Sequence, residues 1–452
     1  MSVDAVEQSL YEVRQTIHPR AVRGWFAAWR WALVWATQIV FYGLAWLTWN
    51  GRQAVLFDIA HRKFFIFGLV FWPQDIIYLT LLLIVSALSL FLFTAVAGRL
   101  WCGYACPQTV YTEIFLWIEQ KIEGDRNARM KLDREGLSSR KFFLKAGKHT
   151  AWMALGFWTG FSFVGYFTPI RELASELARF STGPWETFWI FFYGFATYGN
   201  AGWMREQVCK YMCPYARFQS AMFDKDTLVI TYDRARGEPR GKAAGKGAGQ
   251  GDCVDCSICV QVCPTGIDIR NGLQYECIGC AACIDGCDQV MDKIQRPRGL
   301  IRYSTTNAME GAATQILRPR VLVYAAVLGA VVLASGAGLA LRVPLKVDVI
   351  RDRAAIAREV EGGMIENVYR LQIMNTAEAP RAFEIDVGGL PTVRLEGPQR
   401  VEIEAAGSRM VPVRVRVEPG VAPAGSHRIQ FAVRALDAED VAVREKSVFV
   451  MR

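Results

Sequence analysis

Eight cysteines of the chain fall into two consecutive runs with the same spacing. The runs are Cys253, Cys256, Cys259 and Cys263, and then Cys277, Cys280, Cys283 and Cys287. Both read C-x2-C-x2-C-x3-C, the spacing with which four thiolates hold a cubane 4Fe–4S cluster. Zinc sites favour two separated C-x2-C pairs for each ion. The spacing therefore predicts two 4Fe–4S clusters and a chain that transfers single electrons.

The two runs are expected to exchange one ligand. In paired runs of this kind, the fourth cysteine ligates the cluster of the other run. The predicted ligands are Cys253, Cys256, Cys259 and Cys287 for the first cluster, and Cys277, Cys280, Cys283 and Cys263 for the second. Asp288 follows Cys287 where the first run has a proline, so Cys287 departs from the general pattern.

A second set of four cysteines forms two matched pairs. Cys102 and Cys106 form one pair, Cys209 and Cys213 form the other, and a proline follows each pair. Each C-x3-C-P motif comes directly after a long apolar stretch. Residues i and i+4 lie on one face of a helix, so each pair can present two sulfurs in the same direction. Four thiolates would converge if the two apolar stretches are neighbours.

The chemistry of these pairs indicates a soft metal centre. Sulfur ligands select Cu(I), zinc or an iron–sulfur centre, and the thioether of Met212 suits Cu(I). Free cysteines are often small buried hydrophobes, but two matching pairs at equivalent positions argue against that role. We expect Cys102, Cys106, Cys209 and Cys213, with Met212, to form the metal and reaction site. The metal itself stays open.

Long apolar stretches indicate a membrane protein. A helix needs about 20 apolar residues to cross about 30 Å of hydrocarbon. Five stretches meet this need: residues 31–49, 76–97, 151–168, 185–203 and 321–341. The net charge of +9 lies mainly in loops beside these stretches, so it indicates membrane orientation rather than nucleic-acid binding.

The basic loops orient the predicted spans. Arg14, Arg20, Arg23 and Arg30 precede the first span, and ten Lys or Arg residues follow the second. The positive-inside rule places these segments in the cytoplasm. The N-terminus and both clusters would then be cytoplasmic, and the C-terminal region would lie outside. All twelve cysteines fall at or inside the cytoplasmic face, where thiols stay reduced, so we expect no disulfides.

The fold class expected is multidomain. It comprises an α-helical membrane bundle of five spans, a ferredoxin-like double 4Fe–4S insert and a C-terminal immunoglobulin-like β-sandwich. The expected parts are a cytoplasmic leader (1–30), a four-helix membrane region (31–235), a flexible linker (236–252), the double-cluster domain (253–295), a basic segment (296–320), a fifth transmembrane helix (321–341) and the sandwich (342–452).

Period-two alternation predicts the sandwich. About seven short strands separated by glycine and proline turns are typical of an immunoglobulin-like fold. They cover residues 369–374, 382–387, 392–395, 401–404, 410–417, 428–433 and 447–451. In the first external loop, residues 64–72 are interpreted as a re-entrant or interfacial segment. Asp75 is predicted to accept backbone N–H groups where the second span begins.

Four segments resemble the cytochrome c oxidase accessory proteins called CcoG, FixG or RdxA. The segments are residues 99–109 (RLWCGYACPQT), 123–126 (EGDR), 205–223 (REQVCKYMCPYARFQSAMF) and 277–288 (CIGCAACIDGCD). The last segment includes Asp288, so that departure looks typical of the family. The resemblance covers the whole chain and is most specific through residues 99–302.

The resemblance implies a membrane-bound polyferredoxin of the bacterial inner membrane. Its implied role is to reduce Cu(II) to Cu(I) and so support copper delivery to a haem–copper cytochrome c oxidase. The implied partners are copper ions and the copper transporters or chaperones of oxidase assembly. Copper carriers with Cys and Met ligands accept Cu(I), so Cu(II) must first gain one electron.

Two other classes stay open at this stage. One is an electron-transfer subunit that passes electrons from a quinol or a flavodoxin-type donor to a protein partner. The other is a redox sensor whose clusters report oxygen status. The sequence contains no G-x-G-x-x-G fingerprint for a flavin or nicotinamide dinucleotide, so it does not identify the electron donor.

Overall fold

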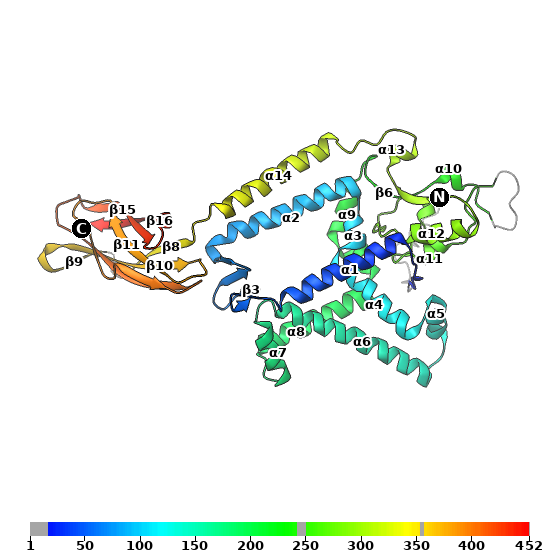
Figure 1. Ribbon diagram of the computed structural model, residues 1–452, viewed down its shortest axis with the longest axis horizontal. Helices are drawn as coiled ribbons and strands as arrows, with labels where there is room; N and C mark the ends of the chain where they lie inside the picture. Colours follow the sequence, from blue (N-terminus) through cyan, green and yellow to red (C-terminus); the bar gives the residue numbers. More distant parts are fainter. Residues whose placement is uncertain (1–16, 242–249, 353–356, 452) are drawn as a thin grey trace, which may run out of the picture. The chain divides into compact units, whose positions relative to one another are not determined.

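The computed structural model describes residues 17–241, 250–352 and 357–451 (Figure 1). They form two compact units. The first comprises the described residues up to Trp46 together with Leu82–Val331, and the second comprises Leu47–Leu81 together with the described residues from Val332 onward. The start of the predicted leader (1–16) and the middle of the predicted linker (242–249) lie outside the described residues.

The first unit is mainly helical. Its helices are α1 (Trp25–Leu44), α3 (Leu100–Tyr104), α4 (Pro107–Glu123), α5 (Arg126–Arg134), α6 (Ser139–Val164), α7 (Ile170–Ala178), α8 (Pro184–Thr197) and α9 (Pro214–Ala221). Two π-helical segments, η4 (Tyr198–Met204) and η5 (Val208–Met212), lie between α8 and α9. Prolines begin α4, α8 and α9, because the first helical residue needs no N–H partner.

Two helices of the described residues are long and apolar enough to cross a membrane. They are Pro73–Ala97, which contains α2 (Ile76–Ala97), and α14 (Pro319–Ala340). Their mean hydropathies are 2.7 and 2.1, and almost none of their side chains are buried. The other three predicted spans overlap α1, α6 and α8, with different ends. The count of five spans therefore stays a prediction.

Helices α6 and α8 approach each other closely through glycines. A β-carbon at Gly160 would lie 2.2 Å from the carbonyl oxygen of Ile190, and one at Gly194 would lie 2.8 Å from the Phe157 ring. Small residues at such crossings allow helix backbones to come together. This contact packs α8 directly against α6.

The cysteine-rich insert is closed by a pair of strands. Strand β6 (Val229–Tyr232) pairs antiparallel with β7 (Ile301–Ser304), so the two ends of the insert meet. Between them lie α10 (Arg234–Gly237), α11 (Ile258–Gln261), the short helix η7 (Ile269–Asn271) and α12 (Ala282–Lys293), and α13 (Thr306–Met309) follows β7. Ile269, Ile284, Met291 and Leu300 are buried in the core of this part.

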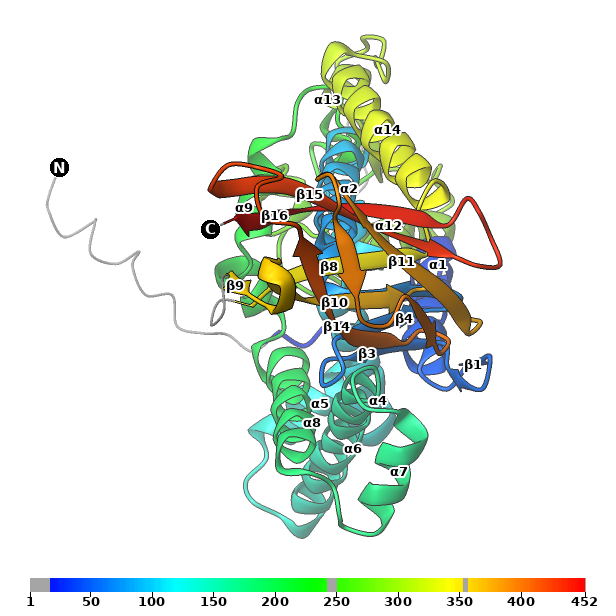
Figure 2. The same cartoon turned by 90° about the vertical axis from the view of Figure 1, so that its left-hand side faces the viewer.

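The second unit contains the predicted β-sandwich (Figure 2). One sheet holds β8 (Leu345–Arg351), β9 (Arg358–Glu359), β10 (Ile365–Asn375), β12 (Arg394–Glu396) and β14 (Ser408–Val417). The other has the order β13 (Arg400–Ile403), β11 (Arg381–Gly388), β15 (Gly425–Ala435) and β16 (Ala442–Met451). Tyr369, Phe383, Phe431 and Phe449 fill the core between the sheets. Strands β8 and β9 were not predicted.

The segment before α2 differs from its prediction. Residues 48–71 form β1 (Thr48–Trp49), β2 (Arg52–Gln53), β3 (Val55–Asp58), β4 (Lys63–Ile66) and β5 (Leu69–Phe71). The interpretation of residues 64–72 as a re-entrant segment is wrong, because Phe65, Val70 and Trp72 pack into a core with Met374 of β10. This loop therefore belongs to the second unit and not to a purely helical region 31–235.

Asp75 has the structural role that was predicted. Its carboxylate accepts the backbone N–H of Trp72 at 3.0 Å. It also forms ion pairs with Arg342 and Lys346, each at 2.6 Å. Asp75 is buried, and these partners neutralise its charge.

Candidate iron–sulfur and cysteine site

The two cysteine runs line two small neighbouring cavities. One cavity is lined by Cys253, Cys256, Cys259 and Cys287. The other is lined by Cys263, Cys277, Cys280 and Cys283, and Cys259 lines both cavities. Each cavity therefore groups three cysteines of one run with the fourth cysteine of the other.

The two runs repeat the same local backbone. The residue after the second cysteine of each run is left-handed, with φ 57° at Ser257 and φ 58° at Ala281. Each is the N-cap of the helix that carries the third cysteine, α11 or α12. Left-handed conformations cost non-glycine residues about 1 kcal/mol, so their repetition at equivalent positions indicates a constrained ligand loop.

The structure explains the residue that follows Cys287. Helix α12 continues to Lys293, so position 288 lies in its interior. A proline there would remove a helical hydrogen bond and clash with the preceding turn. Asp288 instead accepts the backbone N–H of Gly299 at 3.0 Å. In the first run, Pro264 follows the end of α11 at Gln261, where it interrupts no helix.

The chemistry of the sulfur atoms fits a thiolate-bound metal group. Burial raises the pKa of Cys277 and Cys287 to about 12, and that of Cys259 and Cys280 to about 11. Buried thiolates are unstable without a compensating cation. Metal ions displace thiol protons and stabilise the thiolates, so these two cavities suit iron–sulfur clusters.

Each C-x3-C-P pair bridges two helical segments. Cys102 lies in α3 and Cys106 is the N-cap of α4, while Cys209 lies in η5 and Cys213 is the N-cap of α9. The expectation of one continuous helical face for each pair is wrong, because the proline after each pair begins a new helix.

The four cysteines of the two pairs are nevertheless neighbours. The Cys102 thiol donates a hydrogen bond to Gln219 Oε1 of α9 at 3.2 Å. Burial, together with the nearby charges of Cys106 and Cys102, raises the pKa of Cys209 to about 12. Cys213 likewise adds to the effect of burial in raising the pKa of Cys106. The pairs therefore converge.

The described part of the chain contains no three His, Cys, Asp or Glu side chains placed as ligands of a single ion. In a 4Fe–4S cluster each thiolate binds a different iron, so its ligands need not be that close. Met212 is 57% exposed, whereas Cys102 is buried and Cys106, Cys209 and Cys213 are half-buried. The geometry is compatible with either a metal ion or an iron–sulfur cluster at the two C-x3-C-P pairs.

Backbone contact joins the first pair to the second run. A β-carbon at Gly103 would lie 2.7 Å from Cα of Cys280. Gly279 has a φ of +70° and lies against the Arg99 backbone. A β-carbon at Gly279 would lie 3.2 Å from the carbonyl carbon of Arg99. Glycines allow this approach because no side chain intervenes. Cys102 and Cys280 pack in one cluster of buried side chains at this contact, together with Ile278.

Two buried arginines accompany the contact. Arg99 donates to the carbonyl oxygen of Tyr275, and its charge opposes the rise that burial produces in the pKa values of Cys102 and Cys277. Arg30 of α1 donates to the carbonyl oxygen of Cys280 at 2.6 Å. Positive charge beside a cluster stabilises the added electron.

Sequence reasoning missed Arg30, Arg99, Gly103 and Asp285. Asp285 of α12 accepts the backbone N–H of Ala27 at 2.7 Å and so holds the first turn of α1. These roles depend on contacts between distant segments. Gly103 and Asp285 carried a local signal, because each lies between two cysteines with C-x3-C spacing.

Comparisons with known proteins agree with this site. A family described as "4Fe-4S dicluster domain" matches residues 204–306, and one described as "4Fe-4S binding domain" matches residues 79–124. Together they cover all twelve cysteines. A third family, described as the IG-like fold at the C-terminus of FixG, matches residues 336–452. A protein of Rhizobium meliloti, named nitrogen fixation protein FixG, is 38% identical over 98% of this chain and 93% of its own length.

The chain belongs to the FixG/RdxA family. Protein RdxA of Cereibacter sphaeroides is also 38% identical, over 93% of this chain and 92% of its own length. A solved structure of a FixG-related protein from Vibrio parahaemolyticus is 25% identical over 24% of this chain and 97% of that chain, with a TM-score of 0.22.

Membership confirms the resemblance to FixG and RdxA. Together with the matched iron–sulfur families, it identifies this member as an iron–sulfur electron-transfer protein with two 4Fe–4S clusters. The immunoglobulin-like domain predicted for the C-terminal region is confirmed as well.

Proposed function

We propose that this chain is a membrane-bound reductase that converts Cu(II) to Cu(I). The observation that carries the proposal is the backbone contact between Gly103, in the first C-x3-C-P pair, and Cys280 of the second run. Clusters supply single electrons, and reduction of Cu(II) needs one. The contact gives such an electron a short path to the paired cysteines.

The paired cysteines suit the product of that reaction. In this proposal Cys102, Cys106, Cys209 and Cys213 receive copper, and the eight cysteines of the two runs hold the clusters in the crossed arrangement. Thiolates bind Cu(I) in preference to harder ions, so they favour the reduced form. Cu(I) also accepts as few as two ligands, which one pair can provide. Met212 would contribute little, because its side chain is 57% exposed.

The proposal includes a location and a role. Five spans would anchor the chain in a bacterial inner membrane, with the clusters in the cytoplasm and the sandwich in the periplasm. Cu(I) would pass to copper transporters or chaperones and support assembly of a haem–copper cytochrome c oxidase. The exposed apolar faces of α2 and α14 support membrane insertion.

In a second candidate function, electrons leave the clusters through the same contact but pass to a protein partner instead of copper. The family matched over residues 79–124 is described as 4Fe-4S binding and contains Cys102 and Cys106. This observation favours a further iron–sulfur centre at the paired cysteines, which would pass electrons to a protein partner. Iron analysis separates the candidates, because a third cluster adds four iron atoms to the eight of two 4Fe–4S clusters.

The test uses serine variants of the paired cysteines. Cys102→Ser and Cys213→Ser should abolish Cu(II) reduction by the reduced protein while iron and sulfide contents stay at those of two clusters. Met212→Leu serves as the matched control and should keep most of the activity. Wild-type copper reduction by both serine variants would refute the proposed site.

A further inference from the structure

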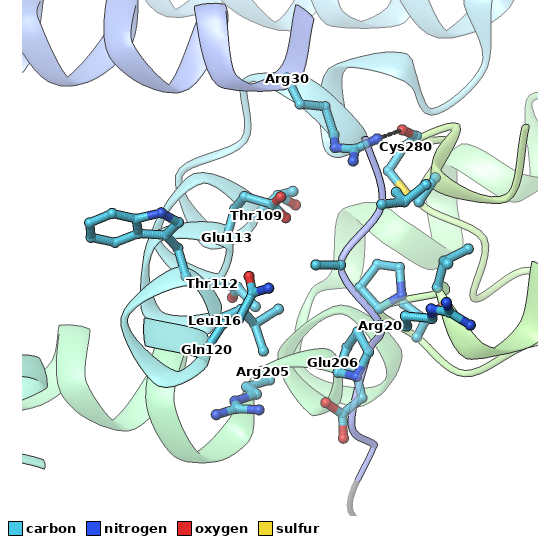
Figure 3. Close-up of a pocket in the computed structure, with 18 of the residues that line it drawn as sticks. Arg20, Arg30, Thr109, Thr112, Glu113, Leu116, Gln120, Arg205, Glu206 and Cys280 are labelled. Atoms are coloured by element: carbon cyan, nitrogen blue, oxygen red, sulfur yellow. Dashed lines mark hydrogen bonds between the residues drawn. The ribbon is translucent and has the colours of Figure 1, made fainter. Parts of the chain in front are cut away.

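A cavity of about 490 Å³ in the first unit reaches both cysteine sets (Figure 3). Cys280 of the second run and Cys209 of the second C-x3-C-P pair both line it. A molecule bound there would contact the two groups between which electrons are proposed to pass. The proposed electron path to copper uses these two cysteines but leaves the cavity itself without a role.

One wall of the cavity is a face of α4. Thr109, Thr112, Glu113, Leu116 and Gln120 lie along this face. Figure 3 shows these side chains on α4, with Arg30 reaching Cys280 from α1. Two hydroxyls, a carboxylate and an amide thus line one side of the cavity, and they can hydrogen-bond a small ring that carries oxygen substituents.

The lining keeps positive charge after its partners are considered. It carries six basic side chains, Arg20, Arg23, Arg30, Lys121, Arg129 and Arg205, and three carboxylates, Glu113, Asp125 and Glu206. Arg129 and Arg205 share the Glu119 carboxylate, which is not part of the lining, and Arg30 donates to the neutral carbonyl oxygen of Cys280. The remaining positive charge can stabilise the oxygen of a bound hydroxyl group as that group loses its proton.

One end of the cavity has the aromatic residues typical of a membrane interface. Trp31 of α1 and Trp117 of α4 line it, with their rings in an edge contact at 6.3 Å. Trp117 is 46% exposed, and Lys121 Nζ lies 5.8 Å from its ring centre. Tryptophan and lysine favour the headgroup level of a bilayer. A lipid-soluble molecule can therefore approach from this end.

We propose that the cavity binds the headgroup of a membrane quinol, which is the electron donor. This inference rests on the proposed electron-transfer function but does not require copper as the acceptor. The quinol loses two electrons and two protons and leaves as quinone. Each of the two 4Fe–4S clusters is reduced by one electron. The Glu113 carboxylate accepts one proton from a quinol hydroxyl, and water at the cytoplasmic mouth accepts the other.

The first experiment asks where a quinone binds. The full-length protein with its clusters, in lipid nanodiscs, is photolabelled with an azidoquinone, and the labelled peptides are identified by mass spectrometry. We expect label on residues 107–123, with protection by excess decylubiquinone. Label confined to other segments, or label on α4 that decylubiquinone does not reduce, would overturn the proposal.

A pair of variants tests the cavity itself. Leu116→Trp fills the space, whereas Ile114→Trp makes a comparable change on α4 at a position that does not line the cavity. We expect Leu116→Trp to weaken decylubiquinone protection at least tenfold, about 1.4 kcal/mol in binding, and Ile114→Trp to change it less than threefold. Equal protection in the two variants, at unchanged iron content, would contradict the site.

A final arm separates this inference from the proposed function. Anaerobic wild-type protein is mixed with decylubiquinol, and cluster reduction is followed by EPR. In parallel, dithionite-reduced wild-type protein is mixed with Cu(II). Cluster reduction by the quinol supports the donor site whatever happens to copper. Oxidised clusters after quinol addition, with copper reduced normally in the dithionite arm, would refute the donor site and leave the copper proposal intact.

Discussion

Gly103 of α3 lies against the loop of the second cysteine run, and a single methyl group would separate the two segments. A β-carbon on Gly103 would lie 2.7 Å from Cα of Cys280, and the three nearest atoms all belong to the backbone of Gly279 and Cys280, which cannot rotate away. Overpacking of this kind costs about 1–3 kcal/mol and moves the backbone. The contact therefore controls the distance between the second cluster and the paired cysteines.

Gly103→Ala should slow electron transfer to copper without removing either cluster. Electron transfer depends steeply on separation, so we expect slower reoxidation of the reduced clusters by Cu(II) in stopped-flow absorbance. Gly136→Ala is the matched control, because nothing lies within 4 Å of its β-carbon position. A wild-type rate in Gly103→Ala would show that electrons do not use this contact.

Cys263 tests the crossed ligand arrangement. It shares a cavity with Cys277, Cys280 and Cys283, although it belongs to the first run. Cys263→Ser should therefore disturb the second cluster more than the first, as measured by EPR of the partly reduced protein and by iron content. Selective loss of the first cluster would show that each run holds its own cluster.

At the scale of elements, the sequence predicts the features whose signal lies within one short segment of the chain. The cysteine spacings and the alternation of the sandwich strands lie within short segments, so the clusters and most strands could be predicted. Phe64–Val70 is an apolar run without clear alternation, which does not distinguish a strand from a membrane-interface segment. The contact of Gly103 with Cys280 joins residues far apart in sequence and leaves no periodic pattern.

Glu366 on β10 makes the stability of the sandwich depend on pH. Burial alone would raise the pKa of Glu366, but Arg416 and Arg358 outweigh burial and hold the pKa below its usual value of 4.5. Arg416 Nε lies 2.7 Å from the carboxylate, and Arg358 Nε lies at the same distance. The ionised Glu366 and its two arginines thus stabilise the fold at pH values above the pKa that Glu366 has in the unfolded chain. This stabilisation is lost as the pH falls through the lower pKa that Glu366 has in the folded protein.

Glu366→Gln should therefore weaken the sandwich at neutral pH and flatten its acid dependence. Removal of one partner of a buried ion pair costs about 3 kcal/mol. Hydrogen exchange of β10 and β14 in the intact protein measures the effect. Glu384→Gln, at a partly exposed pair with Arg434, is the control and should change exchange little. Equal exchange in wild type and Glu366→Gln at neutral pH would contradict this prediction.

At the scale of the whole molecule, the number of spans decides where the two ends of the chain lie. If only α2 and α14 cross the membrane, the N-terminus and the C-terminus share one side. Five spans place them on opposite sides. Helices α1, α6 and α8 carry exposed aromatic side chains, among them Trp35, Trp158 and Phe192, which suit contact with lipid.

Reporter fusions distinguish the two topologies. A reporter fused after Arg452 should be active in the periplasm, and one fused before Met1 should be active in the cytoplasm. The sandwich and the clusters would then face different compartments. Reporters active on the same side would contradict the five-span topology and require an even number of spans.

The central claim is that electrons pass from the clusters to copper through the paired cysteines. The most direct measurement mixes fully reduced protein, freed of dithionite, with Cu(II) and records cluster absorbance and Cu(I) formation together. Wild-type protein should reoxidise and form two Cu(I) ions per chain, one for each cluster. Cys102→Ser protein with both clusters should stay reduced. Reoxidation of Cys102→Ser at the wild-type rate, with the same yield of Cu(I), would contradict the claim.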